Sequence, residues 1–202
     1  MSLKPYDLYK DSGIAWLGEA PATWEVTAIK HGFNIKLGKM LQPEPKGDED
    51  ELAPYVRAAN IQWHGIDTSD IKLMWFSPGE RLELGLQKDD LLVSEGGDVG
   101  RACLWKNELD NCHFQNSVNR VRSKPGHSTR FARYWLSALK DKGFIDVLCN
   151  KSTIAHYTAE KLAATPALLP SHSEQLAIAK FLDRETAKID GLITEQQRLI
   201  EL

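Results

Sequence analysis

Hydrophobic and polar residues alternate in short runs along the first two-thirds of the chain, and this alternation predicts β-strands. Phe33, Ile35 and Leu37 alternate with polar residues until Gly38 ends the run. Four further runs, apolar or alternating and closed by turn residues, predict strands at 55–63, 90–94, 101–105 and 114–123. The glycines of the segment SEGGDVG, residues 94–100, predict a hairpin-like loop between two of these strands.

A helical repeat replaces the alternation after residue 128. Apolar side chains recur at i, i+4, i+7 and i+8 from Phe131 to Leu139 and stop before Gly143. This is the pattern of a helix with one buried face. Ser128 or Thr129 can cap its first turn.

The next two segments carry weaker patterns. Residues 144–150 are apolar but fit either a strand or a helix, and residues 151–169 predict a loop with one helical turn around 158–162. Because the strands come first and the helices late, the order of the elements predicts an α+β fold rather than a doubly wound α/β sheet.

The C-terminal segment, residues 171–202, predicts one long helix. Pro170 precedes Ser171, and Glu174 follows three residues later, which is the sequence of a helix-capping box. Apolar residues form a stripe along this helix at Ile178, Leu182, Ile189, Leu192, Ile193, Leu199 and Ile200. At roughly 1.5 Å per residue the segment would reach about 48 Å, which is longer than a small domain needs.

The apolar stripe predicts that a second helix packs against the first. The segment 171–202 holds six acidic and four basic residues, a net charge of −2, so it is not expected to enter a DNA groove. The alternative is a helix that folds back over its own domain, which the length of the segment disfavours.

The composition is ordinary for a soluble globular protein, with 42% hydrophobic and 26% charged residues. No run of about 18 apolar residues predicts a membrane span, and the first residues lack the apolar core of an export signal. The cysteines Cys103, Cys112 and Cys149 share no CxxC spacing, which predicts ordinary thiols rather than disulfides or a zinc site. We therefore expect a cytoplasmic protein.

Charge is distributed unevenly along the chain, although the net charge is only −3. Residues 101–134 hold seven lysines and arginines and two acids, a local charge of +5, whereas residues 44–51 hold five acids and one lysine, a local charge of −4. A domain with one anion-binding face would show this polarity, and so would a solvated surface with chance clustering.

The usual catalytic and cofactor motifs do not occur. The glycines of EGGDVG fit neither nucleotide-binding pattern, and there is no G-x-S-x-G, no H-E-x-x-H and no Asn-Pro-Pro-aromatic motif of amino-methyltransferases. The six histidines show no ligand spacing, so we expect no metal and no cofactor. Asp70-Ile-Lys72 and Glu44-Pro-Lys46 match only the shortest part of a nuclease motif, which arises often by chance. We expect that the protein is not an enzyme.

Several segments instead carry the chemistry of DNA recognition. Arg can bind guanine, and Asn or Gln can bind adenine, through two hydrogen bonds, while hydroxyl, ammonium and backbone N–H groups bind phosphate. Residues 55–60, 95–101 and 115–120 combine these side chains with glycines or small residues. The predicted DNA-binding residues are Arg57, Asn60, Gly97, Arg101, Gln115, Asn116, Arg120, Arg122, Lys151, Ser152 and Thr153.

Each of these residues also has a purely structural alternative. Asn60 and Asn116 can satisfy turns, and Arg101 can pair with a nearby carboxylate. The face of Arg120 and Arg122 can simply be solvated.

Three stretches closely resemble the specificity (S) subunit of type I DNA restriction–modification systems. They are YKDSGIAWLGEAPATWEV at 9–26, QNSVNRVR at 115–122 and SEQLAIAKFLDRETAKIDGLITEQQRLIEL at 173–202. The last is the most specific, with an acid-Gln-x-x-Ile-Ala-x-Phe-Leu-Asp helix start followed by Thr-Ala-Lys-Ile-Asp. The match covers the chain in outline and is weak in the central part.

The resemblance implies both an architecture and partners. S subunits hold two target recognition domains, each followed by a long helix, and the two helices pair antiparallel. Each domain reads one half of a bipartite site in double-stranded DNA. Modification subunits, which carry the methyl-donor chemistry, dock on the helices and adjoining surfaces, and restriction subunits join later. By this resemblance, residues 1–170 are a DNA target recognition domain and residues 171–202 a spacer or dimerisation helix, half of an antiparallel coiled coil.

The chain holds one such domain and one such helix, about half of the family's usual extent. The resemblance therefore implies either a truncated N-terminal half or a natural half-subunit that pairs with a copy of itself. The end at Leu202 without a helix stop favours truncation. A second hypothesis is an adaptor that binds protein instead of DNA and oligomerises through the helix, but the Arg-, Asn- and Gln-rich segment 115–122 favours DNA.

Overall fold

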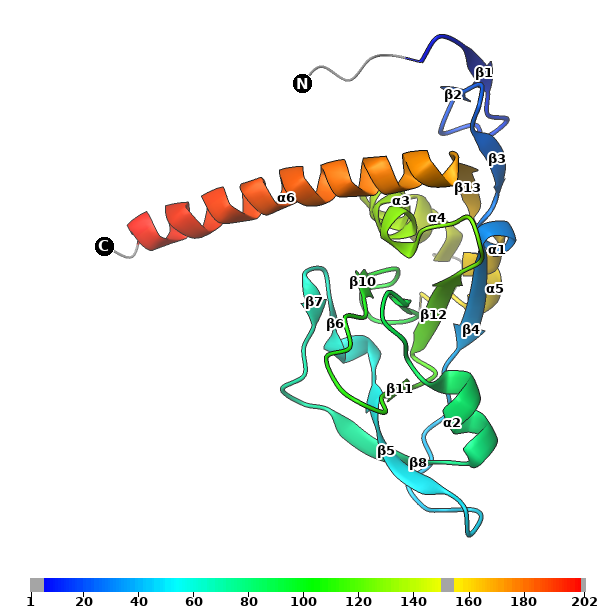
Figure 1. Ribbon diagram of the computed structural model, residues 1–202, viewed down its shortest axis with the longest axis vertical. Helices are drawn as coiled ribbons and strands as arrows, with labels where there is room; N and C mark the ends of the chain where they lie inside the picture. The colour runs from blue at the N-terminus through cyan, green and yellow to red at the C-terminus, as the bar shows by residue number, and fades with distance from the viewer. Residues whose placement is uncertain (1–5, 150–154, 201–202) are drawn as a thin grey trace.

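A strand-rich body carries one long helix, α6 (His172–Ile200), which projects from it (Figure 1). The computed structural model describes residues 6–149 and 155–200. The predicted α+β class and the predicted C-terminal helix are both confirmed.

A four-stranded antiparallel sheet lies at the centre of the body. Its strands follow the order β10 (Ala102–Leu104), β9 (Leu91–Ser94), β12 (Val118–Ser123) and β4 (Phe33–Leu37). Side chains alternate across a strand, so Leu91 and Val93 enter one hydrophobic cluster and Leu92 enters another. Because β9 is buried on both sides, its sequence is apolar rather than alternating.

Helices cover the first face of this sheet. They are α3 (Thr129–Asp141), α4 (Phe144–Cys149) and α5 (Ala159–Ala164). The predicted cap of α3 is present, since the backbone N–H of Phe131 donates to the Ser128 hydroxyl at 3.4 Å. Phe131 and Leu139 are buried as predicted, whereas Ala138 is exposed. The ambiguous segment 144–150 forms a helix over its described residues.

A three-stranded sheet covers the second face, with β11 (His113–Phe114), β5 (Glu51–Val56) and β8 (Lys72–Phe76) in that order. The predicted strand 55–63 is wrong as a single strand. β5 ends at Val56, a 3-10 turn follows at Ala58–Asn60, and a small hairpin of β6 (Ile61–Gln62) and β7 (Gly65–Ile66) comes next. The Asn60 side chain accepts a hydrogen bond from the Arg57 backbone N–H at 3.0 Å, and this local bond turns the chain.

Two further expectations are corrected. The predicted strand 114–123 is interrupted by a turn in which the Val118 N–H donates to the Gln115 carbonyl oxygen at 2.9 Å. Within the predicted loop 151–169, α5 confirms the helical turn, but Pro166–Leu169 forms strand β13, which pairs with β3 (Glu25–Ala28). A four-residue run that begins with proline is a weak strand signal.

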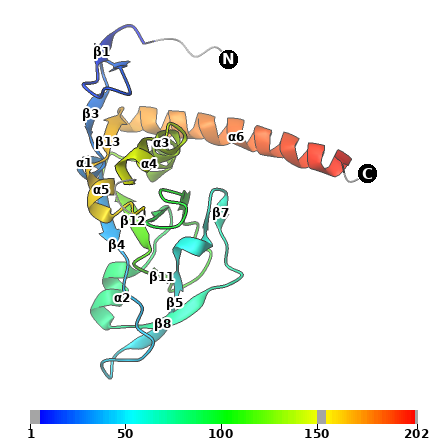
Figure 2. The ribbon, with the colours of Figure 1, turned by 180° about the vertical axis from the view of Figure 1, so that it is seen from behind.

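The remaining elements lie at the edges of the body. They are β1 (Tyr9–Asp11), β2 (Glu19–Pro21), α1 (Ile29–Gly32) and α2 (Pro78–Leu84). Seen from behind, α6 leaves the body beside α3 and β13 and extends well past it (Figure 2). No helix in the described part of the chain is both long and apolar enough to cross a membrane.

The start of α6 is fixed to the body by polar side chains. The Glu174 N–H donates to the Ser171 hydroxyl at 3.4 Å, as the capping box predicts. The Glu174 carboxylate, however, accepts its hydrogen bonds from the body, from the Trp24 indole N–H at 3.2 Å and from the Tyr6 hydroxyl. Burial, together with the hydrogen bond to Glu174, raises the pKa of Tyr6 to about 12.

Candidate nucleic-acid interface

Three loops that are distant in sequence meet beside the central sheet. They are residues 57–60, 95–101 and 115–117, which we call the loop cluster. The Ser117 hydroxyl accepts from the Ala58 N–H at 3.1 Å, and the Ser117 carbonyl oxygen accepts from the Glu95 N–H at 2.9 Å. The Arg101 guanidinium donates to the Ala58 carbonyl oxygen at 3.2 Å. The structure therefore brings together the three segments that the sequence predicts to read DNA.

Gly38 packs against the loop cluster, a role that its place in the sequence did not reveal. A Cβ atom at this position would lie only 2.3 Å from the Gln115 carbonyl oxygen. The next residue, Lys39, accepts a hydrogen bond through its carbonyl oxygen from the Asn116 N–H at 2.9 Å. Only glycine allows the backbones to approach this closely, and the only sequence signal was the glycine that ends the strand.

The side-chain amides of Gln115 and Asn116 remain available to bind a ligand. Both side chains are half-buried. Among the described residues, the Gln115 side chain meets only the Ser117 hydroxyl, at 3.3 Å, and the Asn116 amide meets no hydrogen-bond partner. Gly97 is exposed, with φ at +71° and open space where a side chain would lie. A ligand can therefore approach these amides and the Gly97 backbone closely.

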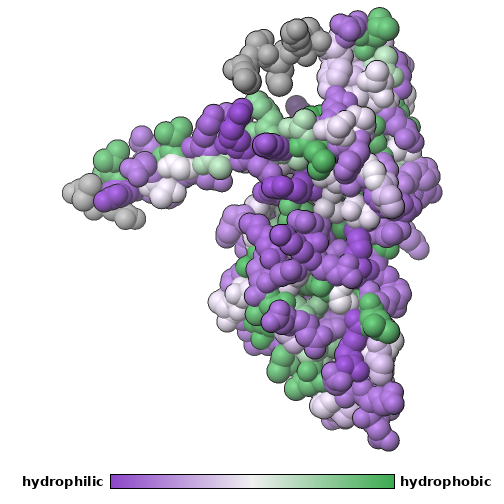
Figure 3. All heavy atoms as spheres, in the orientation of Figure 1, coloured by the Kyte–Doolittle hydropathy of each residue, from purple (hydrophilic) through white to green (hydrophobic). Residues whose placement is uncertain are grey.

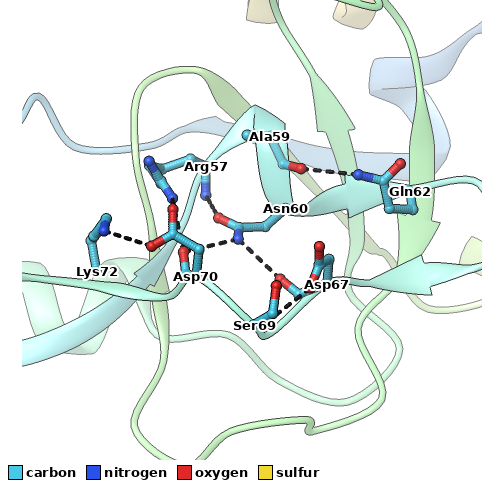
Figure 4. Close-up of polar contacts among 8 residues, drawn as sticks. All are labelled: Arg57, Ala59, Asn60, Gln62, Asp67, Ser69, Asp70 and Lys72. Carbon is cyan, nitrogen blue, oxygen red and sulfur yellow. Dashed lines mark hydrogen bonds and ion pairs between the residues drawn. The ribbon is translucent and has the colours of Figure 1, made fainter.

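Arg57 and Asn60 already hold protein partners (Figure 4). The Arg57 guanidinium donates to the Asp70 carbonyl oxygen at 2.8 Å and to its carboxylate at 2.7 Å. The Asn60 side chain is 3% exposed and donates to the carbonyl oxygens of Asp67, at 2.9 Å, and Asp70, at 3.3 Å. Hydrogen bonds from Lys72 and Arg57 lower the pKa of Asp70. Arg57 and Asn60 thus shape the loop cluster, and their contact with DNA remains a prediction.

Arg120 and Arg122 point into the protein. Arg120 is 7% exposed and donates to the carbonyl oxygens of Glu83, at 3.0 Å, and Gly85, at 3.2 Å. Burial lowers the pKa of this guanidinium. Arg122 makes two 2.7 Å hydrogen bonds to the buried carboxylate of Asp90. These contacts give both residues a structural role, and direct contact with DNA stays untested for them.

Acidic side chains pair with three of the seven basic residues in 101–134, namely Arg101, Arg122 and Arg130. Asp98 lies 3.8 Å from the Arg101 guanidinium and 3.5 Å from the Lys140 ammonium. Asp90 binds Arg122. Burial raises the pKa of the Glu95 carboxyl group, while nearby His156 opposes the shift. The charge pattern therefore supports local ion pairs more than a uniformly positive face.

Lys151, Ser152 and Thr153, the predicted phosphate-binding residues, lie outside the described residues. The chain is next described at 155, and the Tyr157 N–H donates to the Glu95 carbonyl oxygen at 2.9 Å. His156 lies 3.9 Å from the Glu95 carboxylate. His156 and Tyr157 therefore lie beside the loop cluster. Over 6–149 and 155–200, no group of three His, Cys, Asp or Glu side chains is placed to hold a metal ion.

The family model of the type I restriction modification DNA specificity domain matches residues 21–202. The chain belongs to this family. The resemblance predicted from the sequence is therefore confirmed. No curated protein sequence matches the chain.

Solved structures of specificity subunits share the fold of this family member. A chain of a type I R-M system, studied for complex assembly and conformational transition, is 17% identical with a TM-score of 0.63, over 86% of this chain and 40% of that one. The HsdS subunit from Thermoanaerobacter tengcongensis is 16% identical with a TM-score of 0.59, over 88% and 40%. The S subunit from M. genitalium is 21% identical with a TM-score of 0.54, over 85% and 41%. This specificity-domain chain thus spans about two-fifths of their length.

Proposed function

We propose that this chain recognises one half of a bipartite DNA site as part of a type I restriction–modification complex and performs no catalysis itself. The observation that carries this proposal is the loop cluster. Three segments whose side chains are able to bind bases, each more than ten residues from the next, converge in a chain of the DNA specificity family. The second hypothesis, a protein-binding adaptor, gains no comparable support.

Gln115 and Asn116 are the proposed readers of base edges. Their amides are accessible, and an amide can bind adenine through two hydrogen bonds. Arg101 and Gly97 belong to the same loop cluster and would contact a neighbouring base or phosphate. Arg57 and Asn60 would act mainly by holding the loops, and Lys151, Ser152 and Thr153 are proposed to bind phosphate.

α6 is the proposed contact with the second recognition half or with a copy of this chain. Its apolar side chains are exposed beyond the body, at Ile189, Leu192, Ile193, Leu199 and Ile200. Pairing with an antiparallel helix would bury them. Modification and restriction subunits are the proposed further partners.

The proposal is tested by selecting DNA sequences with the assembled complex that carries Gln115→Ala and Asn116→Ala. Each lost base contact should cost about 1–3 kcal/mol of specific binding and relax the preferred sequence. Binding to unrelated DNA and its salt dependence should stay unchanged, because no phosphate contact is removed. Gln87→Ala, an exposed amide outside the loop cluster, is the matched control. An unchanged affinity and preference in the double variant would refute the assignment.

Arg101→Ala separates the two kinds of DNA contact. If Arg101 binds phosphate, the variant should weaken binding to all sequences alike and flatten the salt dependence by about one ion. If Arg101 reads a base, the variant should change the selected sequence instead.

A further inference from the structure

The sheet of β11, β5 and β8 is apolar on its solvent side as well as on its buried side. Ala53, Met74 and Phe76 face the interior and are fully buried. Side chains alternate across a strand, so their neighbours face outward. Four outward residues are apolar, and we call them the outer face: Leu52, Pro54, Leu73 and Trp75.

The four side chains of the outer face form one continuous patch. Leu52 lies opposite Trp75, and Pro54 lies opposite Leu73, in the antiparallel pairing of β5 with β8. Directly opposed residues bring their side chains into contact range. Leu52 is 48% and Leu73 56% exposed, and Figure 3 shows hydrophobic side chains among hydrophilic ones on the lower part of the body. A contiguous apolar patch differs from the scattered exposed residues of an ordinary surface.

The free edge of β8 is partly covered. The Trp75 N–H donates to the Gln42 carbonyl oxygen at 3.0 Å. An additional strand could not use this backbone group. A ligand of the outer face would therefore bind through side chains rather than by extending the sheet.

Acidic residues border the outer face where β5 begins. The segment 44–51 carries a local charge of −4 along the sequence, and although Glu51 pairs with Arg81, Asp48 and Glu49 are exposed. Asp50 accepts hydrogen bonds from the Lys46 N–H and the Gln42 side chain, which lower the pKa of its carboxyl group and keep it ionised. Such a border repels DNA phosphates. It favours a protein segment that carries lysine or arginine beside apolar side chains.

The position of the outer face relative to the loop cluster indicates which protein would bind there. β5 runs from the acidic segment to Val56, and residue 57 begins the loop cluster. A protein docked on the outer face would lie against the strand that leads to the proposed DNA-reading loops. An enzyme that modifies a base near those loops must be held close to them.

We propose that the outer face docks the modification subunit, through a segment of that subunit with aliphatic or aromatic side chains next to basic ones. This inference rests on the proposed function. It adds a site on the recognition body to the contacts expected along α6.

The test measures the affinity of this chain for its cognate modification subunit by calorimetry. Leu52→Ser combined with Leu73→Ser should weaken binding about tenfold or more, as loss of central apolar contacts does in other interfaces. Asp48→Lys combined with Glu49→Lys should weaken binding several-fold and reduce its salt dependence. Leu82→Ser, at a leucine that is 89% exposed on α2 and lies outside the outer face, should change nothing. The charge variants alter only exposed side chains, so they test docking even if the leucine variants fold poorly.

Several outcomes would overturn the proposal. One is an undetectable affinity of the unmodified chain for the modification subunit, and another is an unchanged affinity in both double variants. If the leucine variants reduce the mass of the chain in solution, the outer face binds a second copy. If the charge variants alter only DNA affinity, the face belongs to the DNA interface. A complex that assembles normally but reads no DNA sequence would refute the proposed function and leave the docking site standing.

Discussion

The two halves of α6 carry the same apolar stripe but lie in different surroundings. In the near half, residues 172–186, Ile178 packs against the hydrophobic cluster of the body, and Ala179 is 1% exposed. In the far half, residues 187–200, every residue is exposed, with Ile189 at 55% and Ile193 at 50%. A single amphipathic pattern thus has two uses. The near half packs against the body of the same chain, and the far half leaves its apolar side chains exposed for another contact.

Polar contacts also distinguish the near half. The Gln175 side chain is fully buried, accepts from the Ser128 N–H at 2.9 Å and donates to the Pro170 carbonyl oxygen at 2.9 Å. About two turns further on, Asp183 accepts from the Tyr134 hydroxyl at 2.8 Å and pairs with Arg130 at 2.7 Å. Directional bonds at two points along a helix fix its direction as well as its position. The near half therefore sets where the far half points.

Gln175→Ala should have the largest effect on the folding of a single chain. It leaves the buried N–H of Ser128 and the carbonyl oxygen of Pro170 without partners, and each unsatisfied group costs about 1–3 kcal/mol. We expect the free energy of unfolding to fall by about 2–4 kcal/mol, measured by urea denaturation. Gln196→Ala, the same change in the exposed far half, should stay within about 0.5 kcal/mol. Equal losses in the two variants would contradict the distinction between the halves.

Asp183→Ala should cost less stability and instead loosen the direction of α6. Its bonds to Tyr134 and Arg130 are partly exposed, so the loss of unfolding free energy should be about 1 kcal/mol. Spin labels on Thr68→Cys and Glu195→Cys, both exposed positions, should show a broader distance distribution in the variant.

Asp190→Ala removes a carboxylate from the far half and is the control for this measurement. It should leave the distance distribution as narrow as in the unmodified chain. A narrow distribution in Asp183→Ala as well would mean that apolar packing alone holds the helix.

His127 should make the attachment of the near half of α6 to the body sensitive to acid. Burial lowers the pKa of His127, and its Nδ1 lies 3.5 Å from the Gln175 amide nitrogen. Because the folded pKa lies below the unfolded value of about 6.5, the unfolded chain takes up the proton first as pH falls, and the free energy of unfolding decreases. His127→Asn should therefore lose less stability between about pH 7.5 and 5 than the unmodified chain, by urea unfolding at several pH values.

Some acid sensitivity should persist in His127→Asn. Burial also lowers the pKa of His113, which acts in the same direction. Parallel stability profiles of the variant and the unmodified chain would assign the whole effect to His113 and contradict a role for His127.

Local patterns predicted the elements whose structure is decided locally. The helix after Ser128, strand β4 and the start of α6 follow from periodicity and caps. The break in 55–63 depends on one side-chain bond between Asn60 and the Arg57 backbone, which no alternation of residues reveals. Strand β13 exists because it pairs with β3, more than a hundred residues earlier.

The same limit applies to the candidate site. Sequence chemistry selected the three segments of the loop cluster, but it did not show which side chains would be occupied. Arg122 is bound to Asp90 and Asn60 to the 67–70 loop, partners that only the fold brings near. Gln115 and Asn116 stay accessible because their backbone groups, not their side chains, hold the turn.

Ile189→Glu should have the smallest effect on folding and act almost entirely on association. The Ile189 side chain is 55% exposed, so the free energy of unfolding at low protein concentration should change by less than about 0.5 kcal/mol. A charge in the apolar seam should nevertheless prevent helix pairing, which sedimentation equilibrium would show as a lower average mass. Thr194→Glu adds the same charge on the opposite side of the helix and should leave the mass unchanged. If both variants kept the mass of the unmodified chain, α6 would not pair through this stripe with a second copy, and its partner would have to be another recognition half.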